Sequence, residues 1–384
     1  MNTERIMATM TKEVNEILRD RLFMTLAFIS PVLMMLLMGY GMNLDVENIP
    51  IVILDYDDTP ASRDYAYRYV DSRYFDFKGF VTNEHELEKL IMAAKVRGGI
   101  IIPEHFGARL ASGQGVEVQT LIEGVIPLRA NMTKGYVIAI NAYVNQENLT
   151  GFLSRLQGIP RERAADTINS IRLESRYLYN QAVKSVWSLA PKLIMLILMM
   201  TPPFLTSVSV VREKERGSIL NIYASTVSRA EYIIGKLGPY AVIALFNGVL
   251  LWVLATQLFL APFKGSFLFF LLCTSVYAIC TTGLGLLVSI FVRTQIAAIV
   301  VTMMVTVVPA MLYSGILIPL SSLGTLPKLL AYLAPAMHYS MIIDGTFLKG
   351  EGFATLWIHF MNLVIYTTVL FALSYSLFTK RPKS

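Results

Sequence analysis

Six long stretches without an acidic or basic side chain constrain this chain more than any other feature of its sequence. One helix needs roughly 20 apolar residues to cross a hydrocarbon core about 30 Å thick, and six stretches reach that length. Only 16% of the 384 residues are charged, too few for an ordinary soluble surface. The pattern predicts an α-helical polytopic membrane protein. The six predicted transmembrane helices are residues 22–42, 193–211, 237–260, 267–292, 296–318 and 355–378.

Many of the charged residues lie in one insert after the first predicted span. Residues 43–183 hold 15 Lys and Arg and 18 Asp and Glu, so a polar domain interrupts an apolar body. Strand-like runs alternate with helical ones, which favours a sheet layered with helices. The expected fold class is six transmembrane helices with an inserted α/β extracytoplasmic domain after the first helix. The predicted strands are 49–54, 75–80, 98–102 and 116–122, and long helices are expected from residue 127 onward.

The distribution of basic residues predicts the orientation. With the N-terminus inside, thirteen Lys and Arg face the cytoplasm and three occupy the short outer loops, which is the bias of cytoplasmic loops. Both termini are therefore expected in the cytoplasm. The predicted parts are a cytoplasmic amphipathic interfacial helix (1–21), transmembrane helix 1 (22–42), the extracytoplasmic domain (43–183) and transmembrane helices 2–6 (184–384), with a cytoplasmic coupling loop at 212–236 and a re-entrant outer segment at 319–354.

The N-terminal segment alternates apolar and charged residues at helical spacing. Met7, Val14 and Leu18 belong to its apolar stripe, whereas Lys12 and Glu13 belong to the other face. We expect this helix to lie on the membrane surface with its charged face in water.

No sequence motif supplies energy or catalysis within the chain. The predicted spans contain no Asp, Glu, Lys or Arg for an ion-coupled mechanism, and His359, their one imidazole, is expected to be an interfacial anchor. The phosphate-binding pattern G-x-x-x-x-G-K-S/T fails, because Leu237 follows Gly235-Lys236. The two cysteines and four histidines lack metal-ligand spacing. We therefore expect no catalytic residue, cofactor or metal in this chain, and no nucleic-acid partner.

Prolines and hydroxyl side chains in the second and fifth spans are candidates for lining a passage. Proline leaves a backbone carbonyl without its helical partner, and in lipid such groups are tolerated where protein or a water-filled cavity satisfies them. The alternative is that the prolines only shape helix packing. The candidates are Thr201, Ser207, Thr306 and Pro309.

The connection between the second and third spans is strongly charged at its start. It reads VREKERGSILNIYASTVSRAEYIIGKLGPY at 211–240, and Ser228 with Glu231 forms a capping box that starts the next helix. Ile219, Leu220 and the two apolar residues at 222–223 recur at helical intervals. A short rigid helix there suits the transmission of force to the spans, and a plain solvated loop is the alternative.

This segment resembles the signature loop of the type-2 ABC exporter permeases. Residues 212–217 match the family's Arg-Glu-x-Glu-x-Gly, and 228–231 with 235–237 match the part that follows. The resemblance covers nearly the whole chain. Further matching pieces are LYSGILIP at 312–319, Ala334-Pro335 with Tyr339, and GTFLKG at 345–350.

The resemblance implies the transmembrane permease subunit of an ATP-driven ABC export system in a bacterial inner membrane, exporting drugs, lipids or other small amphipathic molecules. It implies an ABC ATPase subunit that binds the ATP, and a second permease copy in a homodimer or a paralogous heterodimer, surrounded by membrane lipids. The outer domain would serve as a gate or as a docking surface for a periplasmic adaptor protein. The implied ATPase-coupling residues are Arg212, Glu213, Glu215, Arg216 and Gly217.

Three positions depart from the family pattern. Thr226 replaces a usual proline, Asp344 a usual arginine, and Lys192 a usual glycine. Another class of function also stays open, a membrane-anchored sensor or assembly scaffold whose extracytoplasmic domain binds a ligand. An ATPase gene beside this one would favour the exporter.

Overall fold

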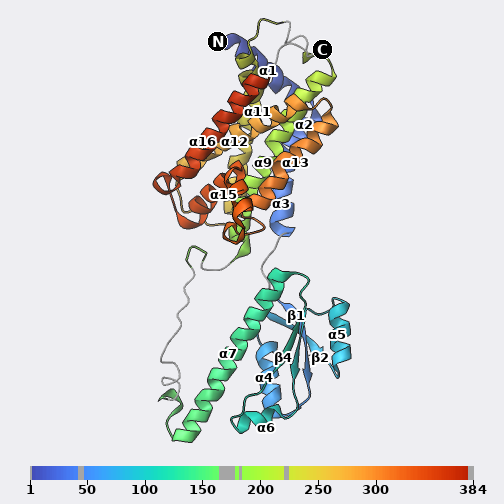
Figure 1. The fold of residues 1–384 in the computed structure, drawn as a ribbon, viewed down its shortest axis with the longest axis vertical. Helices are drawn as coiled ribbons and strands as arrows, with labels where there is room; N and C mark the ends of the chain where they lie inside the picture. Colours follow the sequence, from blue (N-terminus) through green and yellow to red (C-terminus); the bar gives the residue numbers. More distant parts are fainter. Residues whose placement is uncertain (1, 42–46, 164–177, 181–183, 220–224, 379–384) are drawn as a thin grey trace. The chain divides into compact units, whose positions relative to one another are not determined.

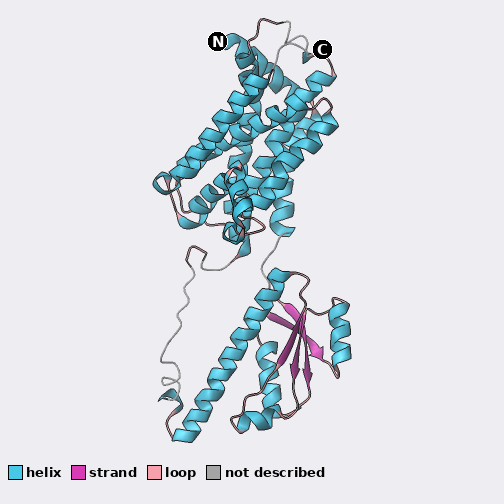
Figure 2. Ribbon diagram, viewed as in Figure 1, coloured by secondary structure: helices cyan, strands magenta, loops and turns pink. Residues whose placement is uncertain are grey.

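The computed structural model describes residues 2–41, 47–163, 178–180, 184–219 and 225–378. They form two compact units. Met1–Leu44 and Tyr177–Ser384 make the helical unit, and Asp45–Arg176 makes the sheet unit. Figure 2 shows that strands occur only in the second of these.

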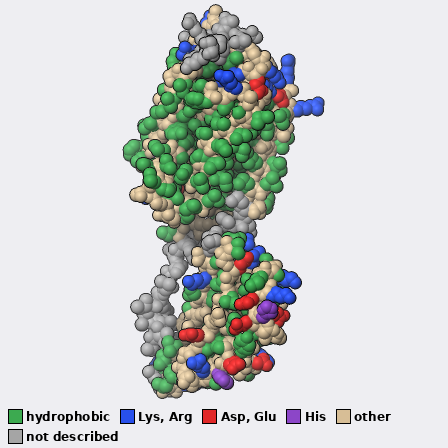
Figure 3. Space-filling view, turned by 45° about the vertical axis from the view of Figure 1, so that its right-hand side comes forward, with side chains coloured by type: hydrophobic (Ala, Val, Ile, Leu, Met, Phe, Trp, Pro, Cys, Tyr) green, Lys and Arg blue, Asp and Glu red, His purple; other side chains and the backbone are tan. Residues whose placement is uncertain are grey.

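Six described helices are long and apolar enough to cross a membrane, which confirms the predicted number. On the face drawn in Figure 3, hydrophobic side chains cover most of the flank of the helical unit, as contact with lipid requires. The candidate spans are Arg21–Gly41, built of α2 (Arg21–Met24), η1 (Thr25–Ile29) and α3 (Ser30–Gly41); α9 (Ser185–Glu215); Arg229–Leu258, built of α11 (Arg229–Val253) and η2 (Leu254–Leu258); α12 (Phe267–Phe291); α13 (Gln295–Tyr313); and α16 (Phe353–Leu377).

Helix α9 is the centre of the helical unit. In an 18-residue apolar stretch of α9, 89% of the residues are buried, against 17% to 61% in the other five spans. The helix contacts α3, α11, α12 and α13. The helix continues through Pro202 and Pro203, and Thr206 Oγ1 donates to the Pro202 carbonyl at 2.8 Å. Helix α12 approaches closely at the same point. A Cβ atom at Gly285 would lie 2.3 Å from the carbonyl oxygen of Pro203.

Two of the spans are longer than predicted. Helix α9 has 31 residues and starts at Ser185 rather than 193, and α11 starts at Arg229 rather than 237. Charged residues at the ends of the apolar stretches therefore belong to the helices, because backbone hydrogen bonding continues where hydropathy falls. The predicted loop 212–236 is helical at both ends. Between them, Leu220 and residues 222–223 lie outside the described residues.

The segment 319–354, predicted to be re-entrant, forms short helices. Each has 10 residues or fewer, too short to cross a bilayer. Helix α15 is largely buried and contacts α9, α12 and α16. The elements are η3 (Leu320–Ser322), α14 (Thr325–Tyr332), α15 (Pro335–Asp344) and η4 (Gly345–Lys349).

The sheet unit has four strands in the order β2-β1-β3-β4, and the four predicted strands are confirmed within three residues. Strands β2, β1 and β3 are parallel, and β4 pairs with β3 antiparallel. The elements are β1 (Ile49–Asp55), α4 (Pro60–Val70), β2 (Phe75–Phe80), α5 (Glu84–Met92), β3 (Gly98–Ile102), α6 (Phe106–Ala111), β4 (Gln119–Ile122) and α7 (Pro127–Gln157).

The apolar side chains of strand β1 point alternately to the two faces of the sheet and so contribute to two separate cores. Ile51 and Ile53 of β1 face a cluster that includes side chains of α4, α6 and α7, whereas Val52 and Leu54 face α5 (Figure 1). Successive strand residues point to opposite faces. Strand β2 lies on one side of β1 in the sheet, and β3 lies on the other side. The two connections therefore run across the sheet in opposite directions, and right-handed crossovers place α4 and α5 on opposite faces.

Candidate functional site: a charged cluster at one end of the helical unit

The charged end of α9 meets the N-terminal helix α1 (Thr3–Arg19) and the start of α11. We call this set the charged cluster: Lys12, Glu13, Glu16 and Asp20 from the N-terminal segment, Arg212, Glu213, Lys214 and Glu215 from α9, and Tyr232 and Lys236 from α11. The described C-terminal end lies nearby, since the Phe378 ring stacks on Tyr232 at 5.2 Å between centroids.

Helix α1 is held along α11 by contacts at its first turns. The backbone N–H of Asn2 donates to Glu231 Oε1 at 2.7 Å, and Arg5 Nη1 donates to the carbonyl of Thr226 at 2.7 Å. Gly235 lets the two helices approach, because a Cβ atom there would lie 2.7 Å from Thr9 Cβ. Thr226 takes part in this contact only through its backbone carbonyl, and a proline at this position would offer the same acceptor.

The structure corrects the predicted exposure of one charged residue of α1, Glu13, and leaves the apolar stripe outward as a membrane-surface helix requires. Glu13, expected in water, is 1% exposed, whereas Met7 and Leu18 are 64% and 60% exposed. Glu13 packs against the protein because Lys236 of α11 pairs with it, and Lys12, which stays partly exposed, pairs with Glu213 of α9. The apolar stripe is left outward, where the predicted membrane surface would cover it.

Glu13 and Lys236 form a fully buried ion pair. Lys236 Nζ donates to Glu13 Oε1 at 2.7 Å and is 0% exposed. Tyr240 Oη and Ser209 Oγ donate to the other carboxylate oxygen at 3.2 and 3.3 Å. Burial raises the pKa of Glu13, and the charge of Lys236 opposes this rise. No sequence pattern indicated this pair, since 223 residues separate its members.

Glu213, predicted to couple to an ATPase, points into the protein. Its carboxylate accepts from Lys12 Nζ at 2.5 Å and from Tyr232 Oη at 2.8 Å, and lies 3.2 Å from Lys236 Nζ. It is 4% exposed. In this conformation Glu213 therefore holds α1 and α11 to α9, and a direct contact with another protein would require it to turn outward.

Arg212 joins α9 to the junction of α1 and α2. Its Nη1 donates to Asp20 Oδ2 at 2.6 Å, and its guanidinium lies over the Phe23 ring at 4.3 Å. Asp20 also accepts from the backbone N–H groups of Leu22 and Phe23. Burial raises the pKa of Asp20, but these amides and Arg212 outweigh it, so the net pKa is lowered.

Lys214 and Glu215, the next two residues of α9, contact α12 and α13. Lys214 Nζ donates to the carbonyls of Ser289 and Ile290 at the end of α12. Glu215 accepts from the backbone N–H of Gln295 at 2.8 Å and from its side-chain amide, at the start of α13. Four consecutive residues of α9 thus contact α1, α11, α12 and α13 between them. The contacts of Lys214 and Glu215 satisfy backbone groups that the end of α12 and the start of α13 leave open.

Arg216 and Gly217 end the helix. Arg216 is exposed, and Gly217 has a φ of 71°, the left-handed conformation that favours glycine after a helix. Of the predicted coupling residues, Glu215, Arg216 and Gly217 are on the surface.

The predicted passage residues lie mostly inside the packing of this single chain. Ser207 Oγ accepts from Thr302 Oγ1 at 2.9 Å between α9 and α13, and Thr306 is 0% exposed. Thr201 is 6% exposed, and Pro309 is half-buried. To line a passage, Ser207 and Thr306 would need α9 and α13 to separate.

Tertiary structure pairs two of the departures from the family pattern. Lys192 Nζ of α9 lies 3.1 Å from Asp344 Oδ2 at the end of α15. An acid at 344 is thus matched by the base at 192, where the family has glycine. It also pairs His359 with His338, whose Nδ1 atoms are 3.1 Å apart, so His359 is not isolated.

One set of carboxylates among the described residues has metal-like spacing. Ligand atoms of Glu13, Glu16 and Glu213 lie within 4.8 Å of one another. Lys12 and Lys236 already contact this set at 2.5 to 3.8 Å. Arg212, 3.9 Å from Glu16, is the third cation beside these three carboxylates, and the arrangement is that of an ion-pair network.

Comparison with known proteins identifies the family of this chain. A family model described as ABC-2 family transporter protein matches residues 21–376. Two similar proteins of Escherichia coli (strain K12) are named probable multidrug ABC transporter permease. YbhS is 26% identical over 386 residues, covering 99% of this chain and 98% of the relative, and YbhR is 24% identical over 377 residues, covering 98% and 99%. The inner membrane transport permease YhhJ of the same strain is 22% identical over 376 residues, covering 96% and 95%. This chain therefore belongs to the ABC-2 family of transporter proteins.

Proposed function

We propose that this chain is the membrane-spanning subunit of an ATP-driven exporter of small amphipathic molecules such as drugs or lipids. Permeases of the family work with a separate ATPase subunit and in general as dimers. The names of the two multidrug permease relatives support the substrate class. The bacterial inner membrane is the proposed location, and the sheet unit would act as a gate or as a docking surface for a periplasmic adaptor.

The charged cluster is the observation that carries the proposal. Residues 212–215 of α9 contact four other helices, and the exposed turn at Arg216 and Gly217 follows directly. A displacement of that turn by a bound ATPase would therefore move several spans together. A plain solvated loop would have no such connections.

We expect transport to require ATP and to tolerate loss of the proton gradient. Inverted membrane vesicles containing this chain and its partner ATPase would be supplied with a fluorescent drug such as Hoechst 33342, with and without ATP and an uncoupler. Uptake that follows ATP hydrolysis supports the exporter. Uptake that continues without ATP and stops with the uncoupler would contradict it and favour an ion-coupled mechanism at the His338–His359 pair.

The topology is tested by accessibility. The bias of basic residues near the span ends supports a topology with the termini and Arg216 in the cytoplasm and Ser112 outside. We expect Ser112→Cys, but not Arg216→Cys, to react with an impermeant maleimide in intact cells with a permeabilised outer membrane. Background should be low, because Cys273 and Cys280 are both 0% exposed. Labelling of Arg216→Cys and not of Ser112→Cys would show that the chain crosses the membrane in the opposite orientation.

A matched pair of variants separates ATPase docking from helix positioning at Glu215. Its carboxylate is exposed, yet it also holds the start of α13 through Gln295. Glu215→Ala removes both the surface charge and this contact, whereas Gln295→Ala keeps the charge and removes only the side-chain amide. We expect Glu215→Ala to lower the copurified ATPase severalfold and Gln295→Ala to leave it near wild type. Equal losses would show that Glu215 acts only by positioning α13.

A further inference from the structure

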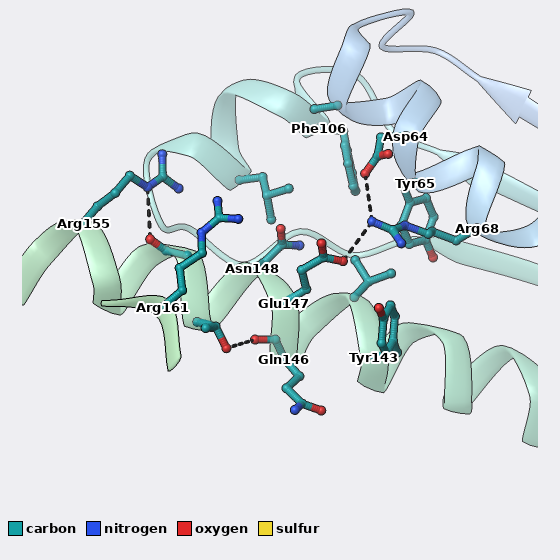
Figure 4. Close-up of a pocket in the computed structure, with 15 residues that line it drawn as sticks. Asp64, Tyr65, Arg68, Phe106, Tyr143, Gln146, Glu147, Asn148, Arg155 and Arg161 are labelled. Atoms are coloured by element: carbon teal, nitrogen blue, oxygen red, sulfur yellow. Dashed lines mark hydrogen bonds and ion pairs between the residues drawn. The ribbon is translucent and has the colours of Figure 1, made fainter. Parts of the chain in front are cut away.

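A groove crosses one side of the sheet unit between α4, α6 and the second half of α7. Its volume is about 440 Å³, within the range of small-molecule sites. It exists because α7 has 31 residues, about 46 Å of helix, and extends beyond the strands on which its first half packs. Figure 4 shows side chains of all three helices facing the groove.

A chain reversal after α7 adds a wall to this groove. Gly158 ends the helix with a φ of 63°, a conformation that favours glycine, and Ser154 Oγ donates to the carbonyl of Ile159 at 2.7 Å. The chain turns back, and Arg161 lines the groove together with Arg155. In Figure 4 both guanidinium groups point toward the side on which α6 lies.

The groove has an unbalanced positive end. At its other end Arg68 pairs with Glu147 at 2.9 Å and with Asp64 at 3.5 Å, so both acids of the groove are engaged. No carboxylate among the described residues pairs with Arg155 or Arg161; Arg155 Nε donates only to the Gly151 carbonyl of its own helix. An anion at this end would supply the negative charge that the two guanidinium groups lack and would accept charge-assisted hydrogen bonds from them.

An apolar wall lies farther along the groove, toward Arg68, and in Figure 4 Phe106 stands beside Tyr65. Phe106 and Leu110 of α6 face Val144 of α7 across the groove. The same three residues also line an adjoining hollow of about 370 Å³ that continues toward Val116 and Val118. The groove therefore leads from two cations, past Asn148, to an apolar surface.

We propose that this groove binds an anionic amphiphile, with its carboxylate or phosphate on Arg155 and Arg161 and its apolar body along Phe106, Leu110 and Val144. The two guanidinium groups select the head, since they offer forked donors to paired oxygens. The adjoining hollow receives the rest of the apolar chain. This site concerns binding by the sheet unit and does not depend on the export mechanism.

Photolabelling of the full-length chain tests the site. The protein in phosphatidylcholine nanodiscs would be irradiated with a dodecanoate carrying a diazirine on its chain, digested and mapped by mass spectrometry. We expect labelled peptides from α6 and from residues 143–161, and much weaker labelling there with the matching uncharged alcohol. Arg155→Gln with Arg161→Gln should lower groove labelling about tenfold, the loss expected for a charge-assisted contact of about 1.4 kcal/mol.

The control variant is Arg109→Gln, which removes an exposed arginine of α6 that does not line the groove, and it should leave the labelling unchanged. Labelling of α16, which faces lipid, serves as the internal standard and should not respond to any variant. Dodecyl phosphate should displace the probe, and inorganic phosphate should not. Equal labelling by acid and alcohol, wild-type labelling of the double variant, or displacement by inorganic phosphate would each overturn the proposal.

Discussion

Replacing Lys236 by methionine should lower the free energy of unfolding of the helical unit by about 3–5 kcal/mol, the usual cost of leaving a buried charge without its partner. The ammonium is 0% exposed and lies 2.7 Å from Glu13 and 3.2 Å from Glu213. Without it, two buried carboxylates face each other with Lys12 as the remaining cation. Unfolding by SDS in mixed micelles, followed by circular dichroism, measures the change.

Two further variants test whether the loss of stability comes from the unpaired buried charge. Lys12→Met removes a cation from the same cluster, but Lys12 is 44% exposed, so the loss should be at most about 1 kcal/mol. Glu13→Gln combined with Lys236→Met removes both charges of the pair and should recover about half of the lost stability or more. A single Lys236→Met variant no less stable than Lys12→Met would show that the buried pair contributes little.

Substitution of Gly285 by alanine should be nearly as damaging, at about 3 kcal/mol. The added Cβ atom would lie 2.3 Å from the carbonyl oxygen and 2.8 Å from the Cα of Pro203. These are backbone atoms of the most buried helix, so no side-chain rotation relieves the overlap and α9 must move away from α12. Transport should be lost together with stability, because the charged cluster depends on the same helix.

Gly283→Ala is the matched control in the same helix. Its added Cβ atom would meet the Phe371 ring at 3.2 Å, and this half-buried side chain can turn aside where backbone cannot. We expect a change below about 1 kcal/mol, measured in the same SDS titration. Equal losses of stability at the two glycines would show that the close approach of Gly285 to the Pro203 backbone is not what makes Gly285→Ala destabilising.

Only part of the charged cluster follows from the sequence. The charge of segment 212–217 and its likeness to a family loop predict its importance and its position at the end of a span. They do not predict the direction of each side chain. Glu13 was assigned to water because a helical wheel shows only which residues share a face, and the identity of the partner surface decides which face is buried.

The sequence by itself determined the six spans, the inserted sheet and the order of its elements, because each depends on local hydropathy or on alternation within a few residues. Only the tertiary structure decided which charges meet. The pairs Glu13–Lys236, Lys192–Asp344 and His338–His359 join residues 223, 152 and 21 positions apart. Such contacts depend on the rotation and depth of each helix against its neighbours. A rotation of one residue turns a side chain by about 100°, and composition and local spacing do not fix it.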